Sequence, residues 1–159
     1  MVESEKAGVK YLALHIATLG GVGLLPKAPG TWGTVATVPF AWLVKEAGSF
    51  WYWLALLLLS VLGSWATSVA CRHFQRKDPS QVVVDEAAGL WVTLLFLPEG
   101  WVWWLVGVVL FRLFDIFKPW PVNWLDRELP SPWGVMADDL AAGLYAGLSM
   151  TLLARIISL

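Results

Sequence analysis

Residues 47–71 read AGSFWYWLALLLLSVLGSWATSVAC, a run that contains no charged side chain. About 20 predominantly apolar residues are enough for an α-helix to cross a bilayer. Aromatic side chains at 51–53 stand near the start of the run, and the basic segment 72–77 follows its end. Aromatic rings favour the membrane–water interface, and basic residues favour the cytoplasmic side. The run therefore predicts a transmembrane helix whose basic end faces the cytoplasm.

The composition of the whole chain agrees with a protein embedded in lipid. Of its 159 residues, 58% are hydrophobic and only 14% are charged, against about 45–50% and about 25% in soluble domains. The chain also holds 12 tryptophans. A net charge of −1 gives no electrostatic basis for nucleic-acid binding, and the single Cys71 excludes an intramolecular disulfide. The length fits a single domain, which we place at residues 1–159.

The remaining apolar stretches are shorter or interrupted. Residues 28–44 include Pro29, Gly30 and Pro39, so we expect a loop followed by a short helix. Residues 87–97 and 101–111 flank Pro-Glu-Gly, which predicts a helical hairpin, and 140–153 predicts a final helix. The expected fold is an all-α, small integral membrane bundle with short or re-entrant helices. Its acidic site is expected at helix termini near the interface, and the number of crossings stays open.

Five carboxylates lie against or within these apolar runs, where an unpaired charge is costly and usually functional. They are Asp85, Glu86, Asp115, Asp138 and Asp139. Two of the segments share a pattern, an acidic doublet followed by small and then apolar residues, at 85–90 and 138–144. An acidic doublet is also typical of a helix N-terminus, where it caps the helix and suits its dipole. With all five acids together, a divalent metal such as Mg²⁺ explains more, because Mg²⁺ prefers hard oxygen ligands.

Three charged residues recur at i, i+3 and i+6 in the segment that ends at Pro119, and so share one helix face. They are Arg112, Asp115 and Lys118. One interpretation is an intrahelical ion pair with a lysine that extends toward water. The other is that Asp115 binds metal while Arg112 and Lys118 hold a phosphate, to which arginine offers a bidentate fork.

A glycine-rich segment at 20–34 adds weaker candidates for phosphate binding. Glycines permit close backbone approach to an anion, and lysine and threonine side chains supply further donors. The candidates are Lys27, Gly30, Thr31 and Gly33. The segment does not match the P-loop pattern, and a turn between helices explains it equally well.

Other phosphatase chemistries lack their residues in this sequence. Cys71 is followed by Lys77 at the position where a Cys-x5-Arg loop needs arginine, and no Asp-x-Asp occurs for an aspartyl-phosphate route. The pattern therefore favours metal-assisted attack of water on phosphorus.

The sequence resembles the phosphatidylglycerophosphatase A family from about residue 20 to residue 147. The blocks that carry the resemblance are PKAPGTWGT (26–34), VDEAAG (84–89), FRLFDIFKPWP (111–121) and GVMADDLAAG (134–143). The glycine pair that usually precedes the last block is replaced by Ser-Pro-Trp at 131–133, which touches no expected ligand.

The resemblance implies a bacterial, Mg²⁺-dependent phosphatase of the inner (cytoplasmic) membrane, multi-pass, with its active site facing the cytoplasm. Its substrate would be the lipid phosphatidylglycerophosphate. The five carboxylates would be catalytic, with Mg²⁺ held among Asp85, Glu86, Asp115 and Asp139. Arg112 and Lys118 would bind phosphate, and the candidates of the glycine-rich segment would assist.

Two other kinds of protein fit parts of the sequence. An ion- or proton-coupled transporter also uses intramembrane carboxylates, but it usually shows longer, repeated spans. A structural membrane subunit would use the acids for ion pairs alone, which leaves excess negative charge. The sequence leaves the oligomeric state open.

Overall fold

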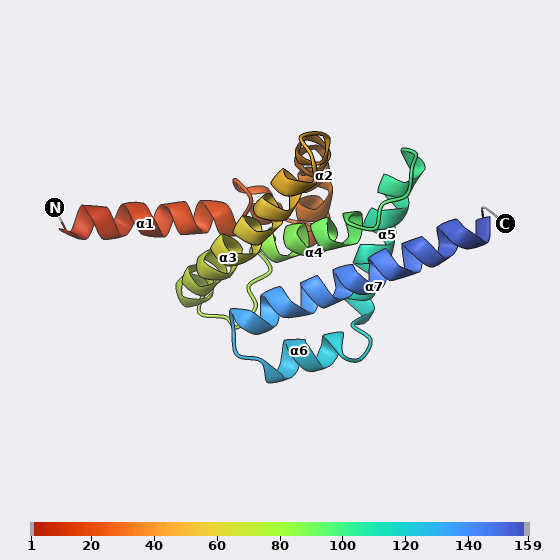
Figure 1. The fold of residues 1–159 in the computed structure, drawn as a ribbon. Helices are drawn as coiled ribbons and strands as arrows, with labels where there is room; N and C mark the ends of the chain where they lie inside the picture. The colour runs from red at the N-terminus through yellow and green to blue at the C-terminus, as the bar shows by residue number, and fades with distance from the viewer. Residues whose placement is uncertain (1, 158–159) are drawn as a thin grey trace.

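The computed structural model describes residues 2–157, which form helices and contain no strand. The elements are α1 (Val2–Ala17), the short 3₁₀ helix η1 (Val22–Leu24), α2 (Pro29–Glu46), α3 (Ser49–Phe74), α4 (Val84–Leu94), α5 (Val102–Phe117), α6 (Val122–Glu128) and α7 (Trp133–Ile157). In the view of Figure 1, α4 lies between α3 and α7, while α1 projects from the rest of the bundle. The predicted all-α class is confirmed.

Helices α3 and α7 are both long and apolar enough to cross a membrane, with mean hydropathies of 1.9 and 1.6. Only 33% and 28% of their most apolar windows are buried inside the protein. A core helix of a soluble protein would be mostly buried, whereas these helices expose large apolar side chains such as Leu57 and Leu152. Lipid is the environment that such a surface suits. The run at 47–71 thus forms the expected helix, and α7 is a second candidate span.

The expectation of a loop and a short helix at 28–44 is wrong. Helix α2 begins at Pro29 and continues through Pro39 to Glu46. Proline suits the first turn because no N–H is needed there. Pro39 removes one backbone hydrogen bond, but it lies on the exposed side. The opposite face of α2 is buried from Gly30 to Ala41, so packing holds the helix together.

The hairpin formed by α4 and α5 agrees with the prediction, but the last helix is longer than expected. It begins at Trp133 rather than near residue 140. Asp138 and Asp139 therefore lie inside α7 and do not cap it, whereas Asp85 and Glu86 do occupy the first turn of α4. Charged side chains inside an apolar helix are costly and usually functional, and capping does not explain these two.

Helices α4 and α7 cross with their backbones in contact at Gly89 and Gly143. A methyl group on Gly143 would overlap the carbonyl oxygen of Gly89. The hydroxyl of Thr93 donates to the carbonyl oxygens of both glycines, at 3.2 and 3.1 Å. Asp85 and Asp139 each precede their glycine by four residues, about one helical turn. The two segments that share the acidic pattern thus pack on each other and bring their carboxylates to one level.

Replacement of Gly143 by alanine should therefore destabilise the fold. We expect Gly143→Ala to lower the free energy of unfolding by about 1–3 kcal/mol, because the added carbon has no room beside a rigid backbone. Gly107→Ala in α5 is the matched control, since a methyl group there meets its neighbours at ordinary contact distance. Thermal unfolding in detergent, followed by circular dichroism, measures both. Equal midpoints for the two variants would contradict a tight α4–α7 crossing.

Candidate active site

The five predicted carboxylates all line one cavity of about 370 Å³. The cavity is bounded by the starts of α2, α4 and α7 and by the end of α5. Arg112, Lys118 and Gly30 line it as well. The structure thus brings together four sequence segments that are separated along the chain, and it gathers the charges of three of them at one end of the bundle.

Three of the carboxylates form a group that is suited to a metal ion. One oxygen from each of Asp85, Glu86 and Asp139 lies within 4.8 Å of the others. Asp85 and Asp139 are only 3% and 4% exposed. The Oε2 atom of Glu86 is buried and has no hydrogen-bond partner among the described residues. Like charges this close are unfavourable unless protons or a cation compensate them.

The protonation of the α4 acids reflects this crowding. Burial raises the pKa of Asp85 to about 6. Burial and the adjacent charge of Asp85 raise the pKa of Glu86 well above its ordinary value. Without a cation, these two side chains therefore hold protons more readily than ordinary carboxyl groups, and a bound cation would displace the protons.

Arg112 connects two of the carboxylates. Its Nη1 atom lies 2.6 Å from Asp115 Oδ2 and 3.6 Å from Glu86 Oε1. The intrahelical ion pair considered for this segment is therefore present, and Asp115 lies outside the three-carboxylate group. The Nε and Nη1 atoms of Arg112 are both buried and have no hydrogen-bond partner within the described part of the chain, although Nη1 lies within ion-pair distance of Asp115. The guanidinium thus keeps donors for a further acceptor.

Lys118 points into the site and not toward water. Its Nζ atom donates to Asp138 Oδ2 at 2.5 Å and lies 3.3 Å from Asp126 Oδ2. The other oxygen of Asp138, Oδ1, is buried and has no hydrogen-bond partner among the described residues. Lys118 therefore fixes one oxygen of Asp138 and leaves the other to a ligand or a proton.

The glycine-rich segment reaches the cavity through Gly30. A methyl group on Gly30 would overlap Glu86 Oε1, so a larger residue at this position would require the Glu86 side chain to move. Gly33 packs on Val83 in the same way and does not line the cavity. Lys27 and Thr31 are exposed and do not line it either. The structure thus separates Gly30 from the other candidates of its segment.

Two polar residues of the cavity were not singled out from the sequence. Asp78 and Ser80 belong to the connection between α3 and α4 and line the same cavity. A hydrogen bond from Val83 N to Ala17 O, at 2.9 Å, attaches this connection to the end of α1. A short polar stretch such as Asp-Pro-Ser is typical of a loop. In the sequence, only the closeness of Asp78 and Ser80 to Asp85 indicated that they belong to the same site.

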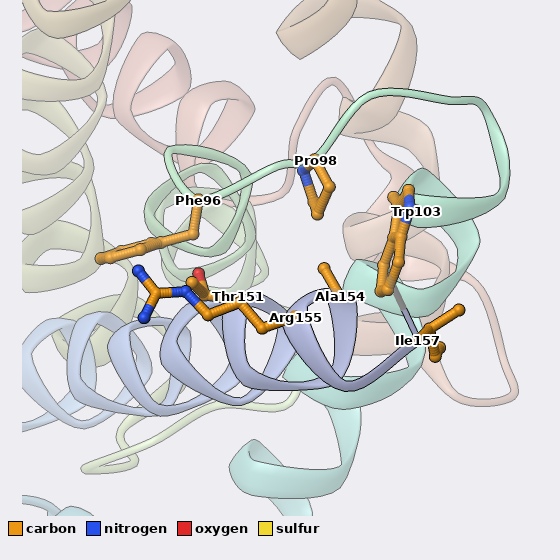
Figure 2. A pocket seen from close by; sticks show the side chains of 7 residues that line it. All are labelled: Phe96, Pro98, Trp103, Thr151, Ala154, Arg155 and Ile157. Carbon is orange, nitrogen blue, oxygen red and sulfur yellow. The ribbon is translucent and has the colours of Figure 1, made fainter. Parts of the chain in front are cut away.

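A hollow at the other end of α7 differs in character from the acidic cavity. Figure 2 shows its lining, where Trp103, Thr151 and Arg155 supply the polar groups and no carboxylate takes part. Thr151, which lines this hollow, lies roughly 18 Å along α7 from Asp139, because the helix rises about 1.5 Å per residue. The chemistry is therefore concentrated at the end of the bundle that carries the acids.

The raised pKa of Asp85 predicts how the metal-free protein responds to pH. An unfolded Asp titrates near about 3.9, and the folded side chain near about 6. The folded state thus binds more protons in this window, so stability should fall as pH rises from about 4 through about 6. In EDTA, Asp85→Asn should flatten the dependence of the unfolding midpoint on pH, whereas Glu99→Gln, at an exposed acid, should not. Parallel profiles for wild type and Asp85→Asn would contradict the shift.

Comparisons with known proteins found a matching family and several related sequences. The family model for phosphatidylglycerophosphatase A matches residues 15–154. Phosphatidylglycerophosphatase A of Escherichia coli is 36% identical over 134 residues, which cover 83% of this chain and 78% of the relative. The Haemophilus influenzae protein of the same name is 34% identical, covering 84% of this chain and 83% of the relative. A Bacteroides thetaiotaomicron protein named "Putative phosphatidylinositol-3-phosphatase" is 35% identical, with coverages of 86% and 89%.

No solved structure matches the chain. The family match nevertheless includes every residue that the structure gathers around the acidic cavity, from Ala28 to Asp139. The chain belongs to the phosphatidylglycerophosphatase A family.

Proposed function

We propose that the chain hydrolyses the terminal phosphate of phosphatidylglycerophosphate to give phosphatidylglycerol, with Mg²⁺ held by Asp85, Glu86 and Asp139. The chain is an enzyme of a phosphatase family, and the names of two relatives support this substrate. One observation supports a metal site most directly: three carboxylate oxygens lie within 4.8 Å of one another at the end of the bundle.

The donor set fits Mg²⁺. All of its atoms are hard carboxylate oxygens, and Glu86 Oε2 is a buried acceptor that lacks a partner among the described residues. When bound, Mg²⁺ would lower the pKa of a water molecule and balance the charge that develops on phosphate. Asp115 stays a further candidate ligand, although in this structure Arg112 holds it.

The other charged residues have roles that follow from their contacts. Arg112 is anchored by Asp115, which leaves its Nε to donate to a phosphate oxygen. Lys118 holds Asp138 through Oδ2, so Asp138 Oδ1 is oriented to take a proton from the attacking water. Lys118 would also lie within reach of the phosphate, since it lines the cavity.

The proposal includes a position in the inner (cytoplasmic) membrane of a bacterium, with more than one crossing. Helices α3 and α7 support the crossings through their length and exposed apolar surface. Cys71 Sγ lies 3.1 Å from Ser131 Oγ, so the basic end of α3 is beside the start of α7. The cavity therefore lies at the basic end, which favours the cytoplasmic side.

Ion or proton transport by the same acidic cluster was the alternative. The carboxylates gather at one end of the bundle and do not form a path along it. The matched family is one of phosphatases. Transport is therefore not favoured.

Phosphate release from phosphatidylglycerophosphate by the purified protein in detergent tests this function. We expect release with Mg²⁺ and none with EDTA. Asp85→Asn and Asp139→Asn should each lower the rate at least about 10²-fold, about 2.7 kcal/mol of barrier, because each removes a charged ligand. Glu99→Gln is the control at an exposed acid.

Two results would contradict the proposal. One is full activity in EDTA, or full activity of both Asn variants, which would show that the reaction does not need a metal at these residues. The other is phosphate release from phosphatidylinositol 3-phosphate and not from phosphatidylglycerophosphate. That result would agree with a phosphatase reaction but contradict the proposed substrate.

The close approach of α2 gives a second test. Gly30→Ala should reduce activity by at least about tenfold, because the methyl group displaces Glu86 from the metal group. Thr31→Val is the neighbouring control, since Thr31 is exposed and outside the cavity. A larger loss in Thr31→Val than in Gly30→Ala would show that the segment acts through its hydroxyl donor and not through close packing.

A further inference from the structure

A groove of about 560 Å³ runs between α3 and α7, the two helices that can cross a membrane. It is separate from the acidic cavity. Helix α7 presents Val135, Asp138 and Asp139 to the cavity but Trp133, Met136 and Leu140 to the groove. At 3.6 residues per turn these two sets lie on opposite sides of the helix. A molecule in the groove therefore does not occupy the position of the substrate phosphate.

The walls of the groove suit a hydrocarbon chain. Val61 and Trp133 line it and are 58% and 63% exposed. The hydroxyls of Ser60 and Ser64, which also line it, donate to carbonyl oxygens one turn earlier in α3, at 2.8 and 2.7 Å. These hydroxyls are thus satisfied within their own helix and need no polar partner from outside.

A positively charged side chain, that of Arg72, lies at the mouth of the groove. Ser68 lines the groove, and Arg72 follows it by four residues on the same face of α3. The Nη1 atom of Arg72 donates to Ser68 Oγ at 2.6 Å, which turns the guanidinium back toward the groove. Arg72 is exposed, and none of the ion pairs in the described part of the chain involves it.

We propose that this groove binds an anionic phospholipid, with an acyl chain between α3 and α7 and the phosphate at Arg72. Basic sites between membrane helices on the cytoplasmic side bind anionic headgroups, and guanidinium matches phosphate in geometry. Small side chains in the groove would also accept a helix from a second copy of the chain. The exposed charge at the mouth favours the lipid, because an apolar helix would leave it without a counter-charge.

Native mass spectrometry of the delipidated protein in detergent tests this site. The probes are phosphatidylglycerol and phosphatidylcholine with identical acyl chains. We expect the wild type to retain one phosphatidylglycerol at least about fivefold more than phosphatidylcholine. Arg72→Gln should abolish that preference, and Ala137→Phe, which fills the groove, should lower retention of both lipids. Arg76→Gln, at an exposed arginine of the same basic segment, should retain the preference.

Further controls separate this site from the active site. Asp139→Asn should retain the lipid, because the groove lies on the other side of α7; the readout is binding, so it does not depend on the phosphatase reaction. Equal retention of the two lipids by wild type would overturn the proposal, as would equal losses in Arg72→Gln and Arg76→Gln. A detergent-corrected mass of two chains that Ala137→Phe reduces to one would assign the groove to a second copy instead.

Discussion

Backbone contact between Gly89 of α4 and Gly143 of α7 fixes the position of the site. Each carboxylate of the pair Asp85 and Asp139 stands one turn before its glycine, so the crossing that brings the backbones together also brings these acids together. Larger residues at either glycine would separate the helices and the ligands with them. Where α2 meets α4, Gly30 lies directly against the side chain of Glu86. The geometry of the acids thus depends on residues that carry no chemistry.

This packing has an electrostatic consequence. Two of the five predicted carboxylates are neutralised, Asp115 by Arg112 and Asp138 by Lys118. The remaining three, Asp85, Glu86 and Asp139, share a largely buried position. Among the described residues, the one ion pair that involves them joins Glu86 to Arg112, at 3.6 Å. A divalent cation would reduce this excess, and the negative charge of a phosphate monoester would in turn suit the metal and Arg112. Under the proposed function, binding of metal and binding of substrate would therefore favour each other.

Much of this could be predicted from the sequence, because it rests on local pattern. The charge-free run at 47–71 predicted α3, and the acids in apolar surroundings predicted a shared site. The prediction for residues 28–44 was wrong because prolines usually break helices. In α2, the burial of one face of the helix outweighs the cost of its two prolines. The start of α7 could not be placed either, since Pro132 and Gly134 are residues typical of turns and loops. Pairing of Lys118 with Asp138, and exclusion of Thr31 from the cavity, depend on tertiary packing that no spacing encodes.

The most direct test is to locate the metal itself. A crystal structure of the protein with Mn²⁺ in place of Mg²⁺, with anomalous differences measured at the manganese edge, would show where the ion binds. We predict a peak bounded by the carboxylates of Asp85, Glu86 and Asp139, and its loss in Asp139→Asn. A peak elsewhere in the chain, or no peak at Mn²⁺ concentrations that support phosphate release, would contradict the assignment of these three residues as the metal site.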